Sequence, residues 1–189
     1  SEQFNGELLV NGQLQDVFTI QDEITGKIVD ALHVRLASAG RAALVRGVRT
    51  RDAVAYDLYL RARRATYELT LADVQRAITL FEQALARDST FAEAWVALAD
   101  AYTFLAQFGN LTPAEVAIRW RRAAERGIEL DSSNGYAYAL RGSVRSVYDW
   151  DWDGAWRDMR RAVALSPASA DVALNYAQFL NLVNEPESS

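Results

Sequence analysis

The sequence predicts an all-α fold in which antiparallel helix pairs stack on one another, preceded by a small N-terminal hairpin and helix. The main observation is an internal repeat, because three windows, 77–95, 120–138 and 155–173, follow one pattern without gaps. The windows start 43 and 35 residues apart, which is typical of helical solenoids. Half of the 189 residues are apolar, enough to form a buried core.

Each window reads as the end of one helix followed by the start of the next. A small residue precedes an aliphatic residue, and a helix-breaking position follows four residues later. The small residues are Ala84, Gly127 and Ala162, the aliphatic residues are Leu85, Ile128 and Val163, and the breaks are Ser89, Ser132 and Pro167. We therefore expect helix pairs over 51–87, 90–131 and 135–166, and a last helix over 170–182.

Residues 1–50 follow a different pattern. The pair Asn11-Gly12 separates two short stretches and is a strong signal for a β-hairpin. Apolar residues then recur every three to four positions over 17–36, which predicts an amphipathic helix, and 37–50 reads as a linker. The sequence thus predicts two parts, 1–50 and a helical array over 51–189.

Capping residues mark the expected starts of three helices in the array. Thr70 with Asp73, and Thr112 with Glu115, have the spacing of capping pairs. The proline after Thr112 fits a first helical turn, where a missing N–H group leaves no bond unmade. Asp153 is expected to cap the second helix of the third pair.

The composition argues against several classes of function. Cysteine is absent, which removes disulfides and thiolate chemistry, and no apolar run reaches the ~18 residues that a membrane span needs. A net charge of −5 argues against nucleic-acid binding. Arginines do cluster over 119–126 and 157–161, where we expect solvated helix faces with ion pairs. We expect a cytoplasmic segment without nucleic-acid partner or membrane insertion.

The sequence predicts no catalytic residue, cofactor or metal site. Residues 149–154 imitate the opening of a calcium loop, but Arg160 stands where the closing glutamate should be. We expect a helix-to-helix turn there, in which Trp150 and the neighbouring tryptophans pack. His33 is the only histidine and has no metal-binding or catalytic companion, and the glycines form no phosphate-binding pattern.

The second helix pair carries the pattern of a known repeat. Its first helix has Trp95, Leu98, Ala99 and Tyr102, and the preceding helix has Ala77, Phe81 and Ala84. This pattern resembles the tetratricopeptide repeat (TPR). The resemblance covers roughly 50–184 and implies a TPR-like α-α superhelix. The departures are Trp120 in place of a small residue, Arg145 in place of an aromatic residue, and serine in place of proline at two breaks.

A narrower resemblance concerns the segments 21–24, 55–60 and 148–152. They look like parts of the C-terminal TPR arrays of bacterial multidomain regulators. In those proteins the array follows a class III adenylate/guanylate cyclase domain, a winged-helix transcription domain or a protein kinase domain. The resemblance implies a non-enzymatic signalling module, with an adenylate cyclase-like parent as first choice, and 1–12 as the end of the preceding domain.

Repeat arrays of this kind mostly bind other proteins, so we predict a protein or peptide partner in the concave groove. Projecting the inward-facing positions of the repeat gives eight candidate partner-binding residues: Glu93, Val96, Asp100, Phe104, Tyr136, Ser143, Asn175 and Gln178. They are acidic, aromatic or neutral. A clamp for a C-terminal carboxylate, which in this family uses lysine, arginine and asparagine, is therefore not expected.

The alternative is a structural homo-oligomerisation module that pairs the output domains of a transcription regulator or kinase. The helix over 170–182 offers Tyr176, Ala177 and Leu180 to a following helix, but only a polar segment follows. Because a repeat buries its apolar face only against a neighbour, we expect a homodimer through this C-terminal helix.

Overall fold

The computed structural model describes residues 50–67, 70–109 and 112–184. The chain divides into two compact units, Ser1–Ala53 and Val54–Ser189. The predicted hairpin, the helix over 17–36, almost all of the linker, and His33 lie outside the described residues.

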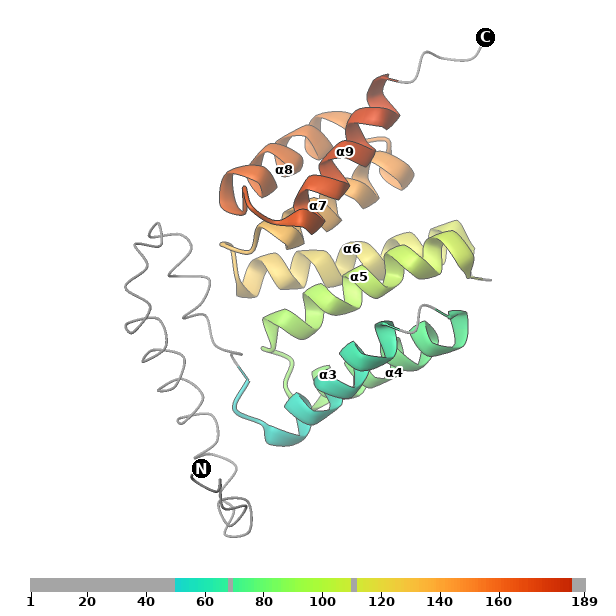
Figure 1. The fold of residues 1–189 in the computed structure, drawn as a ribbon, viewed down its shortest axis with the longest axis vertical. Coiled ribbons are helices and arrows are strands. Elements are labelled where there is room, and N and C mark those ends of the chain that lie inside the picture. Colours follow the sequence, from blue (N-terminus) through green and yellow to red (C-terminus); the bar gives the residue numbers. More distant parts are fainter. Residues whose placement is uncertain (1–49, 68–69, 110–111, 185–189) are drawn as a thin grey trace, which may run out of the picture. The chain divides into compact units, whose positions relative to one another are not determined.

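The regular structure of the described residues is entirely helical, and its helices form consecutive antiparallel pairs (Figure 1). The pairs are α3/α4, α5/α6 and α7/α8, and a single helix, α9, packs on α7 and α8. The bounds are α3 Ala53–Thr66, α4 Leu71–Arg87, α5 Ala92–Phe108, α6 Pro113–Leu130, α7 Gly135–Val144, α8 Trp152–Leu165 and α9 Ala170–Asn184. The predicted all-α class, with three pairs and a last helix, is confirmed.

The internal repeat is visible in the backbone hydrogen bonds. At the ends of α4, α6 and α8, the amide of the C-cap residue donates to the carbonyl of the small residue four positions earlier. These bonds are Asp88 to Ala84, Asp131 to Gly127 and Ser166 to Ala162, each 2.9 Å long. A second bond spans each turn, from Phe91 to Asp88, Asn134 to Asp131 and Ser169 to Ser166. The three predicted windows therefore share one turn geometry.

Aspartates explain why two of these turns form without proline. The Asp88 carboxylate accepts a hydrogen bond from the Thr90 amide (2.9 Å), and the Asp131 carboxylate accepts one from the Ser133 amide (3.1 Å). A carboxylate that binds the backbone two residues later stabilises a turn in place of further helix.

Two of the three predicted caps are confirmed. Thr70 accepts from the Asp73 amide at 3.1 Å. Thr112 forms a complete capping box, because its hydroxyl accepts from the Glu115 amide while the Glu115 carboxylate accepts from the Thr112 amide at 3.0 Å.

The predicted cap of α8 is wrong. Asp151, and not Asp153, precedes the helix, and its carboxylate accepts from the Gly154 amide at 2.9 Å. The helix starts two residues earlier than expected. α7 continues into a π-helix, η2 (Arg145–Asp149), and a left-handed residue ends this helix directly before Asp151. That residue is Trp150, with a φ of 56°.

Trp150 also differs from the prediction that it packs inside the turn. Its side chain is 71% exposed and meets the edge of the Trp152 ring at a centroid distance of 5.9 Å. The left-handed turn places this indole in solvent, whereas Trp152 and Trp156 pack against the core around α8 and α9.

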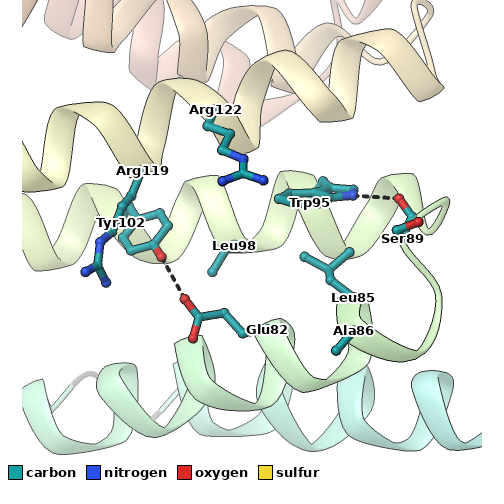
Figure 2. A pocket seen from close by; sticks show the side chains of 9 residues that line it. All are labelled: Glu82, Leu85, Ala86, Ser89, Trp95, Leu98, Tyr102, Arg119 and Arg122. Carbon is teal, nitrogen blue, oxygen red and sulfur yellow. Dashed lines mark hydrogen bonds between the residues drawn. The ribbon is translucent and has the colours of Figure 1, made fainter.

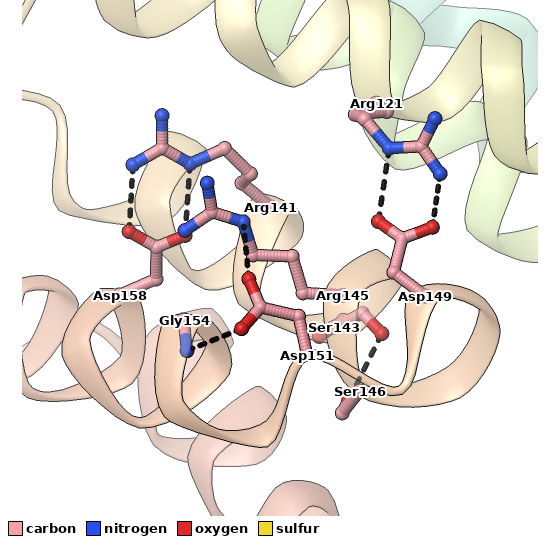
Figure 3. Close-up of polar contacts among 9 residues, drawn as sticks. All are labelled: Arg121, Arg141, Ser143, Arg145, Ser146, Asp149, Asp151, Gly154 and Asp158. Carbon is pink, nitrogen blue, oxygen red and sulfur yellow. Dashed lines mark hydrogen bonds and ion pairs between the residues drawn. The ribbon is translucent and has the colours of Figure 1, made fainter.

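Ion pairs explain how an arginine is accommodated at position 145, where the TPR pattern has an aromatic residue (Figure 3). The carboxylate of Asp158, only 5% exposed, accepts two hydrogen bonds from Arg141 (2.8 and 2.6 Å) and one from Arg145 (2.9 Å). This pairing raises the pKa of Arg141 and keeps its charge fixed. The network joins α7, η2 and α8.

The carboxylates that imitate a calcium loop take part in similar contacts. Asp149 pairs with Arg121 of α6, and Asp151 lies 3.6 Å from Arg145 while capping α8. Within the described ranges, no group of three or more histidine, cysteine, aspartate or glutamate residues could hold a metal ion.

Close packing between helices depends on the small residues of the repeat. Ala84 and Ala162 are fully buried. A Cβ atom built on Gly127 would lie 2.7 Å from Cγ2 of Val96, so only glycine lets α6 approach α5 at this point. Large side chains such as Phe81 and Met159 fill the space beside them.

Candidate functional site

A groove of about 530 Å³ runs along the first helices of successive pairs, α5 and α7, and along α9. Its lining combines apolar, hydroxyl and amide side chains with one acid, and it includes no lysine or arginine. The lining residues are Asp100, Thr103, Ala106, Gln107, Trp120, Tyr136, Ser143, Ser146, Val147, Tyr148, Leu174, Asn175, Gln178, Phe179 and Leu182.

Hydrogen bonds across the groove floor tie its three helices together. The Tyr136 hydroxyl on α7 donates to the Asp100 carboxylate on α5. The Ser143 hydroxyl, two turns further along α7, donates to the side-chain oxygen of Asn175 on α9 at 2.9 Å. Asn175 is itself held by the Asp171 carbonyl at 2.9 Å. The polar groups of the floor therefore have fixed positions.

The Asp100 end of the groove is electronegative. Loss of surrounding water raises the pKa of the Asp100 carboxyl, and the Tyr136 hydrogen bond acts in the opposite direction. The negative charge of Asp171 raises this pKa further, and the positive charge of Arg63 lowers it. Burial, followed by the charge of Asp100, raises the pKa of Tyr136, so that its hydroxyl remains a donor. An unpaired cation placed here would stabilise the ionised Asp100.

Five of the eight predicted partner-binding residues line this groove: Asp100, Tyr136, Ser143, Asn175 and Gln178. The other three lie elsewhere. Val96 is 6% exposed and packs on Gly127, so it belongs to the core. Phe104 packs against Phe108 with a centroid distance of 4.7 Å. Glu93 is half-buried near Tyr59, whose pKa is raised by burial and then by the charge of Glu93.

Sequence reasoning missed several groove residues, for two different reasons. Leu174 and Leu182 lie one helical turn on either side of Gln178, so the same projection could have found them. Val147 and Tyr148 belong to the π-helix, which no sequence pattern indicated. Trp120 lies on α6, the second helix of its pair. The sequence signal that could have identified it is that it replaces the small residue of the TPR pattern.

No family model matches the chain. A stretch of 132 residues, 70% of the chain, is 26% identical to the transcriptional regulator HilA of Salmonella typhimurium and covers 24% of that protein. A stretch of 105 residues, 53% of the chain, is 33% identical to putative adenylate cyclase 3 of Rhizobium meliloti and covers 17% of it. The chain thus spans a quarter or less of the length of these curated relatives.

Among solved structures, the first TPR domain of Spaghetti (RPAP3), bound to an HSP90 peptide, superimposes with a TM-score of 0.56. The match covers 72% of this chain and 98% of that domain at 16% identity. The described helices therefore have the TPR fold. None of them is long and apolar enough to cross a membrane.

Proposed function

We propose that this chain is a non-catalytic interaction module that binds a peptide in the groove between α5, α7 and α9. The observation that carries the proposal is the groove itself, which presents an apolar wall and fixed polar groups on a TPR fold. The similar Spaghetti domain is a TPR domain bound to a peptide, which supports the same use of the fold here.

The chemistry of the groove favours an apolar peptide with a positive charge. Leu174 and Leu182 are 58% and 40% exposed, and they would gain burial from an apolar side chain. Asp100 and Asp171 provide negative charge at one end. The groove lining holds no lysine or arginine, so an acidic peptide would find a counter-charge only in Arg63, whose charge acts on Asp100 from outside the lining.

Trp120 adds a further argument for a bound partner. Its indole N–H group is buried and has no hydrogen-bond acceptor in the described part of the chain. An unsatisfied buried donor is unfavourable by ~1–3 kcal/mol. A peptide carbonyl entering the groove beside Tyr148, which packs edge-on against Trp120, would supply an acceptor after a small side-chain shift.

Selection of peptides from a random display library on the immobilised chain tests this function. We expect enriched peptides to combine apolar residues with lysine or arginine. A synthetic enriched peptide should lose at least roughly tenfold affinity for the Leu174→Ala/Leu182→Ala variant, about 1.4 kcal/mol. Leu60→Ala, which removes a similarly exposed leucine on α3, is the matched control and should bind normally. Equal binding by the double variant would contradict the proposal.

We further propose that the module belongs to a cytoplasmic bacterial signalling protein, with an adenylate cyclase-like parent as first choice. The identity with the Rhizobium meliloti protein supports this choice, and the longer match to HilA supports a transcription regulator instead. The coding sequence upstream of Ser1 distinguishes the two parents. A cyclase domain there would support the first, and a winged-helix domain would favour the second.

Homodimerisation through α9 is the alternative function. Tyr176 and Leu180 are half-buried against the array, and the exposed apolar positions of α9 include Leu174, Ala177 and Leu182. Light scattering over a concentration series tests it, because a dimer would approach twice the monomer mass and Ala177→Glu would restore the monomer. A monomer mass at every concentration would exclude the alternative.

A further inference from the structure

α6 carries four arginines over residues 119–126, and the structure separates them into two groups. Arg121 pairs with Asp149, and Arg126 pairs with Glu129, as expected for ion-paired helix faces. Arg119 and Arg122 form no ion pair in the described part of the chain. They lie three positions apart, and therefore on the same face of α6.

These two arginines line a pocket of about 480 Å³, between α4, α5 and α6 (Figure 2). Half-buried Trp95 provides most of its open apolar surface, because Leu85 and Leu98 are only 6% and 4% exposed. At 100° per residue, Leu98 lies on the opposite side of α5 from Asp100, so the pocket and the groove occupy different faces of the array.

Hydrogen bonds within the chain fix the two aromatic side chains of the pocket, Trp95 and Tyr102. The Trp95 indole N–H donates to the Ser89 carbonyl at 2.9 Å, which leaves its ring as an apolar surface. The Tyr102 hydroxyl donates to the Glu82 carboxylate at 3.2 Å. Burial and then the charge of Glu82 raise the pKa of Tyr102 to about 12, so this bond persists at neutral pH.

The pocket therefore offers two guanidinium groups that form no ion pair in the described part of the chain. They lie in the same lining as the Trp95 ring and the Glu82 carboxylate, and Arg119 also interacts with the Tyr102 hydroxyl. A guanidinium binds carboxylates through two parallel hydrogen bonds. A free inorganic anion would use the arginines but leave the exposed part of the Trp95 ring in water. An acidic side chain with an aliphatic neighbour would use both parts, and the volume lies in the range of ligand-binding pockets.

We propose that this pocket binds an acidic peptide segment in which a glutamate or aspartate lies next to a leucine-like residue. The carboxylate lies between Arg119 and Arg122, and the aliphatic side chain packs on the exposed part of Trp95. This second site does not depend on the function proposed for the groove, which has the opposite charge preference.

A nuclear magnetic resonance titration with the blocked peptide acetyl-Glu-Leu-Glu-Leu-Glu-amide tests the proposal. The reporter is the indole N–H signal of Trp95, assigned with Trp95→Phe. We expect the signal to shift, and Arg119→Ala/Arg122→Ala to weaken binding at least about tenfold. The corresponding glutamine peptide should also bind at least about tenfold more weakly.

The matched control is Arg157→Ala/Arg161→Ala, which removes two exposed arginines of α8 outside the pocket and changes the net charge equally. We expect it to bind within about twofold of the unmodified chain. An equal loss in both double variants, unchanged binding by Arg119→Ala/Arg122→Ala, or equal affinity for the glutamine peptide would overturn the proposal. So would equal affinity for inorganic phosphate.

Discussion

Single residues decide how closely the helices of this array approach and how its charges are paired. Gly127 and Asp158 are the clearest cases. A larger side chain at position 127 would collide with Val96, and the carboxylate of Asp158 pairs with two arginines. The repeat pattern indicated that position 127 requires a small residue for close helix packing. It gave no indication of the role of Asp158. Its two arginine partners lie 13 and 17 residues away, and only the packing of α7 on α8 brings them together.

Asp158→Ala should destabilise the chain by about 3 kcal/mol, because it leaves two partly buried guanidinium groups without their carboxylate. Chemical denaturation followed by circular dichroism measures the change. Asp153→Ala, at an exposed position five residues earlier, is the control and should change the free energy of unfolding by less than about 0.5 kcal/mol. Equal effects of the two substitutions would show that the network contributes nothing specific.

Gly127→Ala should destabilise the chain by ~1–3 kcal/mol, because the new methyl group collides with the Val96 side chain. In the background of Val96→Ala the collision is removed. The same substitution should then become neutral or stabilising by up to ~1 kcal/mol, since alanine favours helix more than glycine does. A double-mutant cycle in urea measures this change of sign, and its absence would refute the contact.

At the scale of elements, the sequence predicted the helices well and the connection between α7 and α8 poorly. Turns with a small residue, an aliphatic residue and a break are local patterns, and all three formed as expected. The π-helix and the left-handed Trp150 depend on contacts with α6 and α8, which no local pattern encodes. The groove residues on η2 were missed for the same reason, whereas those on α5, α7 and α9 follow from helical periodicity.

α9 forms one wall of the groove, and its buried face packs against the core of the array. Phe179 is almost fully buried and packs edge-on against Trp156 at a centroid distance of 4.9 Å. Phe179→Ala should weaken this packing by ~3–5 kcal/mol and loosen α9 before the rest of the array.

Hydrogen exchange measures this effect helix by helix. Amides of α9 should exchange faster in Phe179→Ala, while those of α5 and α6 keep their rates. Asn181→Ala, on the exposed side of α9, is the control. Uniformly faster exchange throughout the chain would contradict a separately loosened helix.

At the scale of the whole molecule, the array presents two sites of opposite charge on different faces. The groove is negative at Asp100, and the pocket on the far side of α5 is positive at Arg119 and Arg122. A net charge of −5 alone would suggest only weak binding of acidic partners. The sequence does not show which arginines of α6 form ion pairs. In the described part of the chain Arg119 and Arg122 form none, and they give the pocket its positive charge.

Binding of a cationic peptide in the groove should depend on pH. The raised pKa of Asp100 means that its carboxylate becomes protonated at a higher pH than an ordinary aspartate does. Because the ionised form attracts the cation, affinity should be full above this pKa and fall as the pH decreases through it. Calorimetry of the unmodified chain and of Asp100→Asn measures the effect, and an unchanged pH profile in the variant would contradict it.

The central claim is that the groove between α5, α7 and α9 is the peptide-binding surface of this TPR fold. A structure of the chain with a peptide selected by display tests it most directly. The account predicts that the peptide contacts Asp100, Tyr136 and Gln178, with an apolar side chain against Leu174. A peptide seated outside this groove, with these four side chains still in contact with solvent, would contradict the claim.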